Sequence, residues 1–83
     1  MPVTVARGAA PQQVIEVLKR VAINQPGITE EPAPQAYVVS FGSAAVSFDL
    51  RVWTDRYEDW IRTRSNLAVA VDEALSRERI AVA

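Results

Sequence analysis

The chain has 83 residues, 49% of them apolar, and nine basic and ten acidic residues give a net charge of -1. This length fits one small domain, and the near-neutral charge argues against a nucleic-acid-binding surface. Because cysteine and histidine are absent, disulfide bonds, thiolate nucleophiles and the commonest general base and metal ligand are excluded. No apolar run reaches the roughly 18 residues that a membrane span requires, so we expect a soluble chain.

The first half of the sequence predicts a strand, a helix and a loop. Residues 2–6, PVTVA, are rich in β-branched side chains and predict a strand. Residues 11–25 begin with a proline suited to a first helical turn and then place apolar side chains at helical spacing. Pro26-Gly27 ends this helix. Two further prolines in residues 27–34 indicate a loop.

The second half predicts a hairpin, a long helix and a final strand. Residues 35–42 and 46–54 alternate as strands around a short turn. A helix is expected over residues 57–78, with Asp55 as its N-terminal cap. Residues 80–83, IAVA, begin another extended run that stops abruptly, and we therefore expect a chain truncated within a strand.

The strand at residues 46–54, VSFDLRVWT, raises the main functional question. Its even positions are apolar and suit a core, whereas Arg51 and Trp53 fall on the opposite, polar side. Trp and Arg are the residue types most enriched at the energetic centres of protein interfaces. With Val38 expected beside them on the neighbouring strand, Arg51 and Trp53 are our candidate subunit interface. The alternative is that Trp53 folds over the edge of its own sheet.

The order strand, helix, strand, strand, helix, strand predicts an α+β fold. It is typical of a ferredoxin-like β-α-β-β-α-β sandwich, in which two helices cover one face of a small antiparallel sheet. We assign residues 1–83 to this single domain. Two helices on one face leave the other face of the sheet without cover from its own chain.

The sequence predicts no catalytic residue, no cofactor, no metal site and no small-molecule substrate. The pair Glu30-Glu31 lies in a loop and lacks the ligand spacing of a cation site, so a solvated acidic loop is the expected role. Ser43 has no base placed to activate it and is interpreted as a turn residue. An RNA-recognition role is disfavoured because one outward aromatic does not make a base-stacking platform.

The stretch PAPQAYVVSFGSAAVSFDLRVWT, residues 32–54, resembles the cytoplasmic part of the small-conductance mechanosensitive (MscS-like) ion channel family. In that family a Pro-Ala-Pro segment leads into a strand, a Phe-Gly turn, and a second strand ending in Leu-Arg-Val-Trp. Residues 3–6, 11–22 and 64–75 resemble the flanking strand and the two helices, so the likeness covers essentially the whole chain. One departure is Arg79, which stands where the family has a glycine after the second helix.

The resemblance implies a non-catalytic role as one part of a cytoplasmic cage below a tension-gated pore that relieves osmotic stress. It implies that the partners are copies of the same subunit, usually seven, and that the membrane is reached through segments upstream of this chain. It places the domain on the cytoplasmic side of the inner membrane and implies truncation at both ends relative to the full channel. The alternative from another class is a stand-alone ferredoxin-like regulatory module that binds a small ligand.

Overall fold

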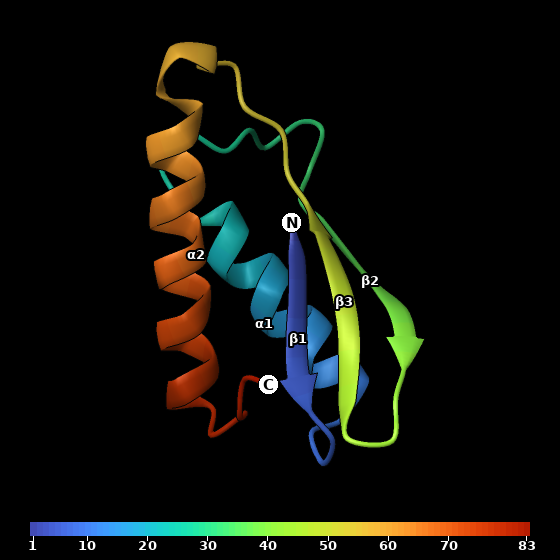
Figure 1. Ribbon diagram of the computed structural model, residues 1–83. Helices are drawn as coiled ribbons and strands as arrows, with labels where there is room; N and C mark the ends of the chain where they lie inside the picture. Colours follow the sequence, from blue (N-terminus) through green and yellow to red (C-terminus); the bar gives the residue numbers. More distant parts are fainter.

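The fold, seen in a computed structural model that describes residues 1–83, is a three-stranded sheet with two helices on one side (Figure 1). The strand and helix types and their order confirm the predicted α+β class. In chain order the elements are β1 (Pro2–Ala6), α1 (Pro11–Ile23), β2 (Gln35–Phe41), β3 (Ala45–Arg51), the short 3-10 helix η1 (Tyr57–Asp59) and α2 (Trp60–Arg77).

The sheet has the order β1-β3-β2, and both neighbouring pairs are antiparallel. β3 therefore lies between two strands that are separated in sequence by α1, as in a split β-α-β unit. The fourth strand expected at residues 80–83 is reduced to one antiparallel bridge between Val82 and Val5. Two hydrogen bonds hold this bridge on the outer edge of β1: the Ala6 N–H donates to Ala81 O at 2.8 Å, and the Ala83 N–H donates to Thr4 O at 3.1 Å.

The core lies between one face of the sheet and the two helices. Strict alternation in β3 sends Val46, Phe48 and Leu50 to this face, and each is at least 97% buried. The register sets Val3 opposite Phe48 and Val5 opposite Val46, so the same face of β1 joins the core. α1 and α2 complete it with side chains at helical spacing: Val14, Val17, Leu18 and Ala22 from α1, and Leu67, Val71, Ala74 and Leu75 from α2.

The start of α2 differs from the expectation at its cap and its first turn. The predicted helix over residues 57–78 divides into η1 and α2, and Asp55 does not cap it, because neither helix start has a side-chain cap. The local hydrogen bond comes instead from the N–H of Arg56, which donates to the Thr54 hydroxyl at 3.1 Å. A hydroxyl that accepts from the N–H two residues further on forms a local turn and does not cap a helix.

The first two turns of α2 extend past the end of the sheet (Figure 1). Ile61, which the helical spacing assigns to the buried stripe, is 86% exposed, and Arg64 and Ala68, which share its side of the helix, are exposed as well. The buried side chains of α2 recur at helical spacing along one side of the helix: Thr63, Leu67, Val71, Ala74 and Leu75. Neither α1 nor α2 combines the length and apolar composition needed to cross a bilayer.

The C-terminal end of α2 is closed by a complete Schellman motif. The Ile80 N–H donates to Leu75 O at 2.8 Å, and the Arg79 N–H donates to Ser76 O at 3.0 Å. Ile80 and Leu75 are both buried, which supplies the hydrophobic contact that accompanies this motif. Arg79 adopts the left-handed conformation with a φ of 59°. Glycine is the residue that takes this conformation without a steric cost.

Candidate functional site

The face of the sheet opposite the helices has no cover from its own chain, and we call it the open face. The register places Thr4 opposite Ser47, and Asp49 opposite Pro2 on one side and Tyr37 on the other. Because alternate side chains share a face, these positions lie together on the side away from α1 and α2. The side chains of the open face are Pro2, Thr4 and Ala6 from β1, Gln35, Tyr37 and Ser40 from β2, and Ala45, Ser47, Asp49 and Arg51 from β3.

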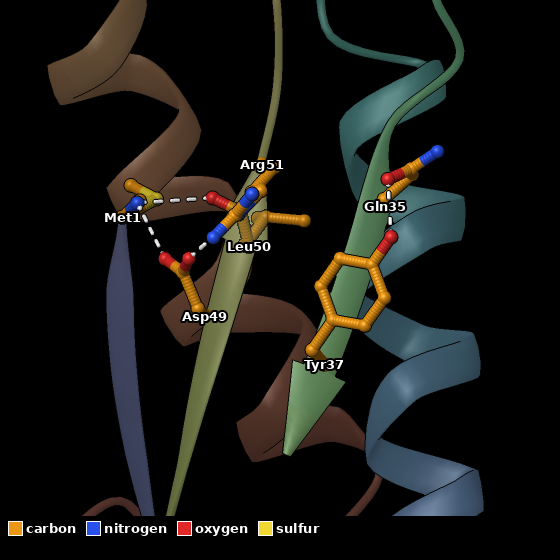
Figure 2. A network of polar contacts seen from close by, with 6 residues as sticks. All are labelled: Met1, Gln35, Tyr37, Asp49, Leu50 and Arg51. Atoms are coloured by element: carbon orange, nitrogen blue, oxygen red, sulfur yellow. Dashed lines mark hydrogen bonds and ion pairs between the residues drawn. The ribbon is translucent and has the colours of Figure 1, made fainter. Parts of the chain in front are cut away.

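Asp49 is the centre of a small charged cluster at one end of the open face (Figure 2). Its carboxylate accepts a hydrogen bond from Arg51 Nε at 3.0 Å and another from the terminal amino group of Met1 at 3.1 Å. The hydrogen bond from Arg51, followed by that from the terminal amino group, lowers the pKa of Asp49 below its ordinary value. The carboxylate is therefore charged at neutral pH and held by two cations.

Arg51 joins this cluster to the neighbouring strand. Its guanidinium carbon lies 5.7 Å from the centre of the Tyr37 ring, within range of a cation–π contact. The Tyr37 hydroxyl in turn donates a hydrogen bond to Gln35 (Figure 2). The Arg51 side chain nevertheless remains 62% exposed. The open face thus presents an arginine and a tyrosine that are already positioned and still accessible to a partner.

Trp53 lies outside the sheet. β3 ends at Arg51, earlier than the predicted strand, so Trp53 belongs to the link toward η1. Its carbonyl accepts a hydrogen bond from the Thr29 N–H at 2.9 Å, which ties this link to the loop before β2. The side chain of Trp53 is 38% exposed and lines a surface cavity of about 350 Å³ with Met1, Trp60 and Arg64. The structure therefore places Trp53 beside the open face, at the end of the molecule where α2 overhangs the sheet.

Val38 lies on the face opposite to the one predicted. It pairs with Phe48 and packs against the hydrophobic core, so it faces the helices. The residue of β2 that stands beside Asp49 on the open face is Tyr37. Both alternating sets of residues 35–41 contain apolar side chains, and hydrophobicity alone cannot decide which set is buried. The clean alternation of β3 was the available signal, but it fixes the face of β2 only once the register is known.

The acidic side chains of this surface do not gather into a cluster. No group of three or more Asp or Glu side chains lies close enough together to hold a metal ion. The single carboxylate on the open face, Asp49, is occupied by its two cationic partners. What this surface provides is a polar, partly aromatic area on a rigid sheet, which suits contact with another macromolecule.

Comparison with known proteins identifies the lineage of this domain. The sequence profile described as "Mechanosensitive ion channel MscS, C-terminal" matches residues 1–82. The chain belongs to the MscS C-terminal domain family. An "Uncharacterized MscS family protein" of Haemophilus influenzae is 31% identical to it over 81 residues, which are 98% of this chain. The family predicted from the Leu-Arg-Val-Trp strand and its flanking segments is therefore confirmed.

The MscS relative is much longer than the present chain, which spans about 7% of its length. The comparisons therefore concern this domain alone. The resemblance covers every helix and strand of the fold, from β1 to the end of α2.

Proposed function

We propose that this MscS-type domain is a non-catalytic wall element of the cytoplasmic cage below a tension-gated pore. In that role the parent channel opens under membrane tension and relieves hypo-osmotic stress. The domain lies on the cytoplasmic side of the inner membrane and assembles with identical subunits, seven in the complete channel. The observation that carries this proposal is the match of the channel-domain profile to residues 1–82, which covers the whole fold.

The open face supports an assembly role for this domain. Two helices cover one side of the sheet, while the other side keeps Arg51 62% exposed and Trp53 lies 38% exposed beside it. Arg and Trp carry large shares of the binding energy in protein interfaces when a partner desolvates them. We therefore keep Arg51 and Trp53 as the proposed subunit contacts. Val38 is not among them, because it packs against the hydrophobic core.

Channel activity of the parent polypeptide tests the function directly. The polypeptide that carries this chain is expressed in bacteria that lack their own mechanosensitive channels. We expect rescued survival after hypo-osmotic shock and tension-activated currents in membrane patches. Protein that reaches the membrane in normal amounts but gives no current at any tolerated tension would contradict the proposal.

The subunit contacts are tested by the double variant Arg51→Ala/Trp53→Ala in the same polypeptide. We expect a loss of the assembled ring in mild detergent, because both side chains of the contact are removed. The matched control is Ile61→Ala, which removes an apolar side chain that is 86% exposed on α2 and outside the proposed contact. Equal ring stability in the double variant and the control would exclude Arg51 and Trp53 as the contact.

A further inference from the structure

The outer edge of β2 has no partner in the fold. β2 is the last strand in the sheet order β1-β3-β2, and no helix or strand lies beyond it in Figure 1. Three of its large side chains are well exposed: Tyr37 at 48%, Val39 at 65% and Phe41 at 61%. An exposed apolar edge strand is a surface on which a further strand can pair.

This edge lacks the charges that usually prevent such pairing. Residues 32–48 contain no Asp, Glu, Lys or Arg, so no side chain of β2 carries a charge at neutral pH. Edge strands of monomeric proteins are commonly protected by lysine or by other charges. Because β2 itself carries no charged side chain, two identical β2 edges can pair without setting like charges directly opposite each other.

The backbone groups that point outward from β2 follow from the ladder on its other side. The Leu50 N–H donates to Met1 O at 2.9 Å, so the even positions of β3 bond toward β1. The odd positions of β3 therefore bond toward β2, where Asp49 is opposite Tyr37. By alternation, the N–H and C=O groups of Ala36 and Val38 point to the free edge.

We propose that β2 is the contact through which two copies of this chain pair, antiparallel, about a two-fold axis at Tyr37. Ala36 of each copy then lies opposite Val38 of the other, and the two pairs exchange about four backbone hydrogen bonds. Tyr37 meets its own counterpart as the close, non-hydrogen-bonded pair on the axis, with both rings on the open face. The result is one continuous six-stranded sheet.

Features at both ends of β2 limit the pairing to this short stretch. Pro34, just before the strand, has no N–H to donate to a partner. At the other end of the paired stretch, a register shift between Val38 and Ser40 interrupts the regular pairing of β2. The outer edge of β1 already pairs with the residues around Val82, so the sheet offers no second equivalent edge. Association therefore closes at two copies and does not continue into a filament.

This pairing is separate from the ring contact proposed above and does not depend on it. A ring joins two different surfaces of each subunit, whereas a two-fold contact joins one surface to itself. The paired segment spans about five residues in each copy. The surface area that it buries is therefore smaller than the roughly 1,200 Å² at which stable interfaces begin. We therefore expect a weak dimer that forms as concentration rises.

The mass of the 83-residue chain in solution tests the pairing. Sedimentation equilibrium from about 10 μM to about 1 mM should show the mean mass rising from 9.1 kDa toward twice that value. Tyr37→Lys sets two ammonium groups against each other on the axis and should abolish this rise. The control Val69→Lys makes the same charge change at a 55% exposed side chain of α2 and should leave it intact. Mass that stays at the monomer value throughout, or a rise that survives Tyr37→Lys, overturns the proposal.

Cross-linking tests the register independently of affinity. The chain contains no cysteine, so Tyr37→Cys introduces the only thiol. Across a two-fold axis at this position the Cα atoms lie about 4.5 Å apart, close enough for a disulfide. Mild oxidation should convert this variant to a covalent dimer at least about tenfold faster than Val69→Cys. Equal rates for the two variants, with both folded by circular dichroism, exclude the proposed register.

Discussion

Arg79→Gly is expected to stabilise the protein, because Arg79 holds a backbone conformation that favours glycine. Its φ of 59° lies in the left-handed region, and the two Schellman hydrogen bonds at the end of α2 keep it there. A side chain in this conformation costs roughly 1–2 kcal/mol through the contact between its Cβ and the backbone. Glycine avoids that cost but loses about 0.5–1 kcal/mol through greater freedom in the unfolded chain.

Taking the middle of each range, the net gain is about 0.75 kcal/mol in the free energy of unfolding, equivalent to a rise in Tm of about 3–6 °C for a domain of this size. Urea unfolding followed by the fluorescence of Trp53 and Trp60, with circular dichroism as a second probe, measures this gain. Arg79→Ala is the matched control, because it removes the same side chain and retains the Cβ. If the Gly and Ala variants have equal unfolding free energies, the left-handed conformation is not the cause and the reasoning is refuted.

Three further predictions concern the loops, the core and the charged cluster. Gly27→Ala should lower the free energy of unfolding by about 1–3 kcal/mol, because φ there is 92° and a Cβ would lie 3.0 Å from Thr63 Oγ1. Gly8→Ala is the control: φ there is 124°, but no atom lies within 4 Å of the added Cβ, so the loss in the same urea titration should be smaller. Phe48→Ala should cost about 3–5 kcal/mol in urea unfolding, because this side chain is 99% buried at the centre of β3. A cost below about 1 kcal/mol there would contradict the assigned core. Asp49→Asn should lower the free energy of unfolding by less than about 1 kcal/mol at pH 7, because the carboxylate is partly exposed. Since the folded-state pKa of Asp49 is lowered, the difference between the variant and the original protein should shrink as pH falls below about 4. A difference that persists at low pH would show that the charge of Asp49 is not its source.

The fold class could be predicted because periodicity and turn residues agreed along most of the chain. β3 alternates apolar and polar side chains without interruption, and its buried face was assigned correctly. α1 ended near Pro26-Gly27 as predicted, two residues earlier than the expected limit. These features depend on neighbouring residues and on short-range sterics, which are contained in the sequence.

The candidate site was predicted only in part, because its geometry depends on contacts distant in sequence. Arg51 was assigned correctly to the polar side of its strand, but Val38 was placed on the wrong face. The residue that stands in its place is Tyr37 on β2, which contacts Arg51 on the neighbouring strand β3. Pairing between strands sets such contacts, and the register shift after Val38 has no signature in the sequence.

The sequence by itself determined the class of the domain, its family and the absence of thiol and imidazole chemistry. The tertiary structure decided which side of β2 is buried, how far α2 reaches past the sheet and which strand edge remains unpaired. The physical reason is that local alternation defines two faces for every strand and helix. Only packing against the rest of the chain decides which of these faces loses contact with water.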